Sequence, residues 1–258
     1  MNKYVLIVDC GNTNTSIGVF KENKLYSRID IPSSIDAING SLSRMLNFKK
    51  KLLLDDEELT GGLISSVVPS LNKAIITLLK EAFGKSIPIM DNTYFFDIKM
   101  DVNNPNEVGG DLLADAIAGK KLFDAPTLII DLGTITKLIV LDKNKKFIGT
   151  SFFPGVETCL KSMKEKTALL PEISLNKRPK KFLGNNTVDA MQSGLYYGTL
   201  GLIKYSSIMV DDMFEGKVNK ILTGGNSILF KNDANEFIID ENLVLKGIYL
   251  IYLDNIGK

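Results

Sequence analysis

The stretch "VLIVDCGNTNTSIGVF", residues 5–20, places two apolar runs on either side of a polar linker. The first run ends in Asp9, and Gly11 follows two residues later. A tight hairpin needs only about two turn residues. This linker is longer and is rich in hydroxyl and amide side chains, which are those of Asn12, Thr13, Asn14, Thr15 and Ser16. It therefore has more hydrogen-bond donors than a turn requires, together with one acid.

A second copy of this pattern starts 122 positions further along the chain. The shift places Asp9 on Asp131 and Gly11 on Gly133. Each copy predicts a strand, an Asp-x-Gly turn, a second strand, a short charged turn and a third strand. We interpret the repeat as an internal duplication.

The remaining segments alternate between predicted strands and helices, which is typical of an α/β fold. We expect strands at "GGLISSVVPS" (61–70) and "SIPIMD" (86–91), with Pro69 in the first turn of a helix. A further helix follows "NEVGGD", with Leu113, Ile117 and Leu122 facing inward. We therefore expect two α/β lobes that face each other, so that the two Asp-x-Gly turns flank a cleft. The expected lobes are residues 1–124 and 125–258.

The segment 185–214 is predicted to form one long helix, with Thr187 as its N-cap. The residues expected to line its apolar side are Met191, Leu195, Leu202, Tyr205 and Met209. Gly194, Gly198 and Gly201 weaken this helix in isolation. They suit a helix against which another backbone packs closely.

Composition excludes several classes of function. The 258 residues include 31 basic and 30 acidic side chains, so a net charge of +1 predicts neither nucleic-acid nor membrane binding. No apolar run approaches the roughly 20 residues of a membrane span, and no signal peptide is evident. The chain has two cysteines, Cys10 and Cys159, and no histidine. We expect a cytoplasmic protein whose acid–base chemistry uses carboxylates, Lys, Tyr or Cys.

Three glycine turns follow predicted strands: "DCGNT", "DLGTIT" and "LTGGNS". Backbone N–H groups in such turns can bind phosphate, and an aspartate at the strand end can hold a hydrated Mg²⁺ ion. Each turn by itself is equally compatible with an ordinary hairpin or helix entry. Their occurrence on a duplicated scaffold favours phosphate binding, although neither a Walker A loop nor a dinucleotide motif is present.

Asp111 follows two glycines and opens a predicted helix. One interpretation is an acid favoured by the helix dipole, and from the sequence alone this is slightly the better one. The other is an acid that accepts the proton of a substrate hydroxyl. Phosphoryl transfer tolerates a weak base because positioning contributes more than proton abstraction.

The chain resembles type III pantothenate kinases, within the superfamily of acetate and sugar kinases, heat-shock chaperones and actin. The motifs that carry the resemblance are "DCGNTNTS", "NPNEVGGD", "DLGTIT", "FPGVETCLKSMKEKTALLP", "GNNTVDAMQSGLYYG" and "TGGNS". The resemblance implies two ribonuclease-H-like lobes, as in actin-like ATPases, and a homodimer. It also implies ATP-dependent phosphorylation of pantothenate to 4′-phosphopantothenate, the first step of coenzyme A biosynthesis, with Mg²⁺ and a monovalent cation, K⁺ or NH₄⁺.

By position, the resemblance assigns Asp111 as the catalytic base, Asp9 to Mg²⁺ and Asp131 to the monovalent cation. The implied ATP contacts are Asp9, Gly11, Asn12, Thr13, Asn14, Thr15, Ser16 and Thr134. The implied substrate contacts are Gly109, Gly110, Asp111, Leu112 and Thr187.

Three positions depart from the family pattern. Leu112 stands where an arginine usually follows the acid, Val102 where a tyrosine is usual, and Lys137 where the second turn often has threonine. The Lys137 ammonium could replace the monovalent cation, or Lys137 could be a solvated strand residue. A catalytically weakened nucleotide-binding or regulatory protein, or a kinase of another small hydroxy acid, is therefore the alternative to a pantothenate kinase.

Overall fold

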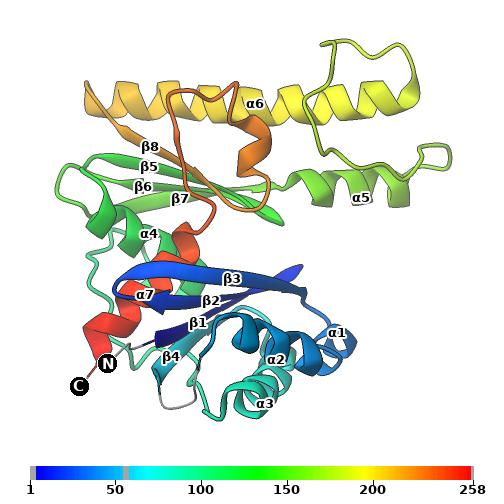
Figure 1. Cartoon of the computed structure of the whole chain (residues 1–258). Coiled ribbons are helices and arrows are strands. Elements are labelled where there is room, and N and C mark those ends of the chain that lie inside the picture. Colours follow the sequence, from blue (N-terminus) through cyan, green and yellow to red (C-terminus); the bar gives the residue numbers. More distant parts are fainter. Residues whose placement is uncertain (1–3, 55–57, 257–258) are drawn as a thin grey trace. The chain divides into compact units, whose positions relative to one another are not determined.

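The computed structural model describes residues 4–54 and 58–256, which form two compact units. The first unit takes its described residues from the chain up to Asp97, from Asn104–Ala118 and from Val244 onward. The second comprises Ile98–Asn103 and Gly119–Leu243. This division differs from residues 1–124 and 125–258, because the last helix returns to the sheet of the first unit (Figure 1).

The sheet of the first unit has the strand order β3-β2-β1-β4, with β1 antiparallel to β2 and parallel to β4. Helices α1, α2 and α3 pack on the face that carries Leu6, Val8 and Cys10 (Figure 1). The strands are β1 (Tyr4–Cys10), β2 (Asn14–Lys21), β3 (Lys24–Pro32) and β4 (Leu59–Ser66). The helices are α1 (Ile35–Asn39), α2 (Leu42–Lys51), the short 3₁₀ helix η1 (Pro69–Leu71) and α3 (Asn72–Phe83).

The opposite face of this sheet is covered by α7 (Leu243–Asn255), which also packs on α4 (Gly110–Leu122). The rings of Phe20 and Tyr249 stack with their centroids 4.3 Å apart. Gly247 allows the helices to meet closely, since a Cβ there would overlap the carbonyl oxygen of Ala114. Asp9 lies on this face, because side chains alternate along β1 and its neighbours Val8 and Cys10 face the other way.

The second unit repeats the arrangement with the strand order β7-β6-β5-β8-β9. Side chains of α5 and α6 pack on the face that carries Leu128, Ile130 and Leu222. The strands are β5 (Thr127–Leu132), β6 (Ile135–Leu141), β7 (Phe147–Pro154), β8 (Asn219–Thr223) and β9 (Ile238–Ile239). The helices are α5 (Val156–Lys166), α6 (Thr187–Phe214) and the 3₁₀ helix η3 (Ser227–Phe230). Two successive three-strand meanders, each with a fourth strand parallel to the first, confirm the predicted duplication.

The duplication is not a constant shift throughout. The pair Cys10 and Thr15 closes the first turn, whereas Leu132 and Thr136 close a second turn that is one residue shorter. Lys137 therefore pairs with Asp131 at the position that Ser16 takes opposite Asp9.

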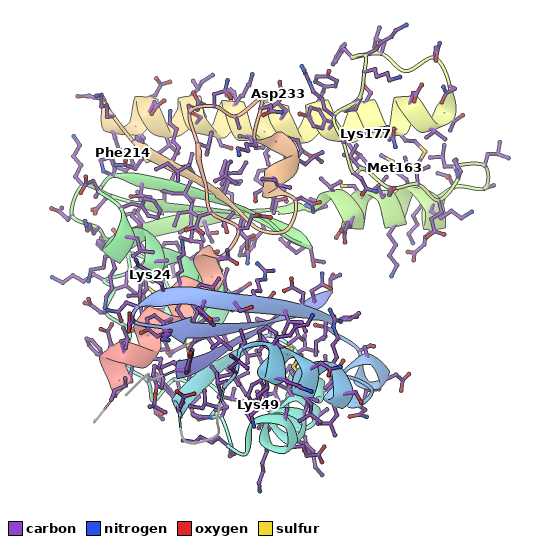
Figure 2. All side chains as sticks on the ribbon, viewed as in Figure 1. Lys24, Lys49, Met163, Lys177, Phe214 and Asp233 are labelled. Carbon is purple, nitrogen blue, oxygen red and sulfur yellow. The ribbon has the colours of Figure 1, made fainter. Side chains whose placement is uncertain are left out.

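A buried tyrosine ties α6 to the loop that follows η3. The Tyr196 hydroxyl donates a hydrogen bond to the carboxylate of Asp233, which is labelled in Figure 2 and also pairs with Arg178 at 3.0 Å. Burial, and then this hydrogen bond, raises the pKa of Tyr196. Among the described helices, none has the length and apolar character of a membrane span.

Two of the predicted elements are wrong in detail. The segment 86–91 makes only an isolated bridge between Ile89 and Ile64 and no strand, since Pro88 has no N–H group to donate to a ladder. Leu122 does not face inward but is 46 % exposed, because it is the last residue of α4, where the chain turns toward β5.

The long helix is confirmed, but two of its details are wrong. Its N-cap is Asn186, whose side-chain oxygen accepts a hydrogen bond of 2.9 Å from the N–H of Asp189. Tyr205 and Met209 are exposed rather than inward-facing. Ser206, Ser207 and Val210 are buried in that half of the helix, so small and branched residues form its packed side.

Candidate active site

The first Asp-x-Gly turn joins β1 to β2 in the first unit. Gly11 donates a backbone hydrogen bond of 3.1 Å to the carbonyl of Asn14. Asn12, Thr13 and Asn14 are exposed at the tip. Thr15 is buried on the opposite face, where its hydroxyl lies 2.9 Å from the Ser33 hydroxyl. The tip thus presents amide, hydroxyl and backbone groups to solvent, whereas the buried Thr15 side chain contacts Ser33 and helps to hold the turn in place.

A row of polar residues crosses the sheet next to this turn. In the register of the sheet, Asp9 lies opposite Ser16 on β2 and opposite Ser65 on β4, and Ser16 lies opposite Asp30 on β3. The Ser16 hydroxyl accepts a hydrogen bond of 3.0 Å from the guanidinium of Arg28. Sequence reasoning missed Ser65, Asp30 and Arg28, although Ser65 stands at the end of a predicted strand as Asp9 does.

The start of α4 lies against this row. A Cβ at Gly110 would be 2.9 Å from the Ser65 hydroxyl, so a glycine lets the helix approach β4 at the residue that neighbours Asp9. Asp111 is half-buried, and its Oδ1 accepts a hydrogen bond of 2.9 Å from the N–H of Leu112. The structure therefore brings two predicted motifs, distant in the sequence, to the same edge of one sheet.

Leu112 and Val102 occupy different surroundings from each other. Leu112 is only 6 % exposed, and so packs as an apolar core residue at the start of α4. Val102 belongs to the second unit, where the neighbouring Asp101 pairs with Lys146 at 2.9 Å. Gly109 stands directly before α4 in the first unit, where its close neighbour is the Asp111 carboxylate.

The second Asp-x-Gly turn carries a buried ion pair. The Lys137 Nζ lies 2.7 Å from Oδ2 of Asp131, and neither residue is more than 9 % exposed. Lys137 is therefore not a solvated strand residue. Gly224 also approaches this carboxylate, and a Cβ there would overlap Asp131 Oδ1. Thr134 is exposed, and its carbonyl accepts hydrogen bonds from Gly155 and from the Thr158 hydroxyl.

The third glycine turn connects β8 to η3 in the same unit. Asn226 donates a backbone hydrogen bond of 3.2 Å to Leu132, which fixes this turn beside the second one. The hydroxyls of Thr223 and Ser227 are buried and find no hydrogen-bond partner among the residues that the structure describes. These two hydroxyls are donors that sequence reasoning did not single out. Thr187, by contrast, is exposed at the first position of α6.

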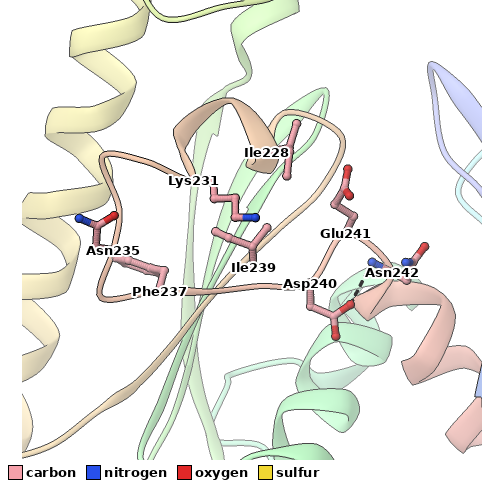
Figure 3. A pocket seen from close by; sticks show the side chains of 8 residues that line it. All are labelled: Ile228, Lys231, Asn235, Phe237, Ile239, Asp240, Glu241 and Asn242. Atoms are coloured by element: carbon pink, nitrogen blue, oxygen red, sulfur yellow. Dashed lines mark hydrogen bonds between the residues drawn. The ribbon is translucent and has the colours of Figure 1, made fainter.

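One cavity adjoins the third turn, and a second lies beside η3. One, of about 450 Å³, lies between α5 and the segment 172–176 and has Asn226 in its wall. The other, of about 550 Å³, is shown in Figure 3. Its lining residues are Ile228, Lys231, Asn235, Phe237, Ile239, Asp240, Glu241 and Asn242. Both cavities are lined by apolar and charged side chains.

Comparisons with known proteins identify the family. Residues 5–207 match the family model of type III pantothenate kinases. The chain belongs to the type III pantothenate kinase family. A type III pantothenate kinase of Dictyoglomus turgidum is 33% identical over 258 residues, covering 98% of this chain and 100% of the relative. One of Sulfurihydrogenibium sp. is 32% identical over 96% and 98% of the two chains.

Solved structures confirm the two-lobed, actin-like fold. A Baf family protein from Campylobacter jejuni superposes with a TM-score of 0.60 at 17% identity, over 97% of this chain and 98% of that one. The activator of a 2-hydroxyisocaproyl-CoA dehydratase from Clostridium difficile, with bound ADPNP, gives 0.56 at 14% identity over 98% and 96%. The strands β1–β4 and β5–β8 form the two copies of the ribonuclease-H-like lobe that the sequence predicted.

Type III pantothenate kinases use ATP together with a metal ion, generally Mg²⁺, and the first unit offers a fitting donor set. No cluster of three or more Cys, Asp or Glu suited to a metal occurs in residues 4–54 and 58–256. Mg²⁺ commonly takes only one or two protein carboxylates and keeps waters and phosphates as its other ligands. Asp9, with the buried Ser65 hydroxyl on the neighbouring strand, meets that requirement.

Proposed function

We propose that this protein catalyses the ATP-dependent phosphorylation of pantothenate to 4′-phosphopantothenate, the first step of coenzyme A biosynthesis. One observation carries the proposal beyond family membership: Gly110 brings the Asp111 end of α4 against Ser65, next to Asp9. An acid suited to Mg²⁺ and an acid suited to a substrate hydroxyl thus both lie near the carboxyl ends of β1 and β4. A cytoplasmic location is part of the proposal and agrees with two free cysteines.

In the first unit, we assign Asp9 to Mg²⁺, which when bound neutralises charge on the phosphates. The turn from Gly11 to Ser16 supplies donors to ATP phosphates through its exposed tip. The Asp111 carboxylate accepts the proton of the pantothenate primary hydroxyl. Gly109, Gly110 and Leu112 border the substrate, and the last of these does so through its backbone because its side chain is buried.

In the second unit, we assign Thr134 to ATP and Thr187 to pantothenate. Both residues are exposed, which supports a role in ligand contact. In neither assignment does the threonine side chain take part in proton or phosphoryl transfer. A threonine hydroxyl contributes a hydrogen bond that orients the ligand, and positioning is the main source of catalysis in phosphoryl transfer.

A K⁺ or NH₄⁺ ion does not fit beside Asp131 in this chain. The carboxylate already pairs with the Lys137 ammonium at 2.7 Å, in a site where both side chains are buried. A second cation there would meet a like charge at short range. We therefore propose that Lys137 supplies the fixed charge, so that the enzyme does not depend on a monovalent cation.

We propose a homodimer whose contact includes α6. One exposed stripe of this helix combines three glycines with apolar side chains, and its members are Gly194, Gly198, Gly201, Tyr205 and Ile208. Apart from the two chain neighbours of each glycine and the helix's own backbone, no described atom lies within 4 Å of a Cβ built at any of these glycines. A second copy of this helix fits such a stripe, since small residues let backbones approach closely.

Release of ADP from MgATP with pantothenate tests the function. We expect turnover by the unmutated protein and at least about a hundredfold lower kcat in Asp111→Asn, the range for loss of a general base. Asp124→Asn, which changes an exposed acid, is the matched control and should retain full activity. Other small hydroxy acids are assayed in parallel, because Leu112 removes the arginine that is usual in the family.

Two results would contradict this assignment. Turnover of another hydroxy acid in place of pantothenate would make the protein a different kinase. Nucleotide binding without turnover of any of these acids would indicate a catalytically weakened, nucleotide-binding member of the family.

A further inference from the structure

Arg28 holds a positive charge beside the first Asp-x-Gly turn, and no role assigned above uses it. It lies on β3, two residues before Asp30 and on the same face, so its side chain reaches the polar row. Its Nε pairs with Asp30 Oδ1 at 2.8 Å, and its Nη2 donates to the Ser16 hydroxyl at 3.0 Å. The side chain remains 29 % exposed. Two bonds from two strands therefore fix the plane of a guanidinium that solvent, and a ligand, can reach.

The bond to Ser16 has a chemical consequence for that residue. A hydroxyl has one hydrogen to donate and two lone pairs that accept. Because Arg28 donates to the Ser16 oxygen, the hydroxyl hydrogen of Ser16 points elsewhere. Ser16 lies in the row directly opposite Asp9, at the end of the first Asp-x-Gly turn. The contact with Arg28 thus leaves the Ser16 hydroxyl hydrogen free to donate to an anionic ligand bound at the turn.

The turn itself carries no fixed positive charge. Its side chains from residue 11 to residue 16 are amides and hydroxyls. In the second unit the position of Ser16 is taken by Lys137, whose ammonium lies beside Asp131. In the first unit the corresponding charge comes from Arg28, one strand further away. Each Asp-x-Gly turn is therefore accompanied by a basic side chain from a nearby strand, and this side chain lies on the same face of the sheet as the aspartate of the turn.

We propose that Arg28 is a positioning residue for the nucleotide phosphates at the first turn. It orients the Ser16 hydroxyl and supplies the positive charge that the turn lacks; a planar guanidinium suits phosphate oxygens. This inference rests on the proposed ATP-dependent function, because it requires an anionic ligand at the turn. It concerns the phosphates and not the acceptor, so its effect falls on MgATP.

The test compares Arg28→Gln, Arg28→Lys and the control Arg44→Gln, which changes an exposed arginine of α2. Binding of MgATP and of adenosine is measured by calorimetry without pantothenate, and KM for each substrate by ADP release. We expect Arg28→Gln to weaken MgATP binding roughly tenfold to a hundredfold, the range for a lost hydrogen bond to a charged group. Adenosine binding and the KM for pantothenate should change less than about twofold.

Arg28→Lys should recover part of the MgATP affinity, since lysine keeps the charge but lacks the planar fork with which arginine contacts Asp30 and Ser16 together. A purely structural role would lower the melting temperature and weaken MgATP and adenosine equally, which would overturn the inference. Equal effects of Arg28→Gln and Arg44→Gln, or no MgATP binding by the unmutated protein, would overturn it as well. If the unmutated protein binds MgATP but does not turn over pantothenate, the proposed function fails, and the comparison of Arg28 variants still decides this inference.

Discussion

Lys137 is the residue on which the proposed independence from a monovalent cation depends. Its ammonium lies 2.7 Å from the Asp131 carboxylate in a buried pair. We expect turnover by the unmutated protein to change less than about twofold when K⁺ or NH₄⁺ replaces Na⁺. Lys137→Thr should lose activity and about 3–5 kcal/mol of stability, because it leaves a buried carboxylate unpaired. Strict dependence of the unmutated protein on K⁺ would contradict this prediction.

Ammonium rescue separates the role of Lys137 in charge from a role in packing. NH₄⁺ has the charge and donors of the missing side chain, so it should raise both the activity and the melting temperature of Lys137→Thr. Lys143→Thr removes an exposed lysine of the same hairpin and should show no such response. The measurements are ADP release and thermal unfolding in Na⁺, K⁺ and NH₄⁺ buffers.

Gly224 and Gly225 make a matched pair for testing how closely the third turn approaches Asp131. Gly224 has a φ of +85°, and a Cβ there would overlap Asp131 Oδ1. We expect Gly224→Ala to cost more than about 1 kcal/mol, because the backbone is strained and the carboxylate must move. A Cβ at Gly225 meets nothing within 4 Å, so Gly225→Ala should stay within about 0.5 kcal/mol. The measurement is urea unfolding of both variants. Equal unfolding midpoints would show that Gly224 does not need to approach Asp131 closely.

At the scale of elements, the start of α6 depends on Asn186. Its side chain accepts from the N–H of Asp189 and donates to the Asp189 carboxylate at 2.8 Å. Asn186→Ala should lower the free energy of unfolding by about 1 kcal/mol, as for other lost N-caps. Thr187→Ala is the control, since Thr187 makes no capping bond among the described residues and should cost less than about 0.5 kcal/mol. If urea denaturation ranks the two variants the other way, Thr187 is the cap.

At the scale of the whole molecule, the exposed stripe of α6 predicts the assembly state. Tyr205 and Ile208 are 66 % and 55 % exposed. The double variant Tyr205→Asp, Ile208→Asp should convert a dimer to a monomer in sedimentation velocity, because two charges would be buried at the contact. Leu46→Asp on α2 changes a leucine that is 45 % exposed and should leave the dimer intact. A monomeric unmutated protein would rule out this contact.

Because α7 packs on the sheet of the first unit, we expect this unit to need α7 in order to fold. Residues 1–124 without α7 would expose the sheet face on which Phe20 stacks against Tyr249. We expect this fragment to lack dispersed amide signals in NMR spectra. Linking residues 243–258 to it should restore them, because buried aromatic area contributes several kcal/mol in a unit of this size. A folded 1–124 fragment would show that α7 is dispensable for the first unit.

Much of the site was predictable from local patterns. Alternation along β1 places Asp9 on the face opposite Val8, and glycine after a strand-end acid marks each turn. These features depend on neighbours in the sequence. The packed side of α6 was predicted less well, because its exposed stripe is also apolar, and periodicity does not distinguish a stripe that meets the sheet from one that meets solvent or another chain.

The sequence by itself determined the duplicated strand–turn–strand units, the two aspartates at the strand ends and the acid that opens α4. Only the tertiary structure decided that Lys137 faces Asp131, that Arg28 reaches Ser16, and that α4 meets β4 at Gly110. The physical reason is strand register and helix packing. A turn shorter by one residue exchanges the faces of the β6 side chains relative to those of β2, and the original shift between the two copies returns only at β7. The packing of α4 on β4 is settled by contacts between segments far apart in the chain.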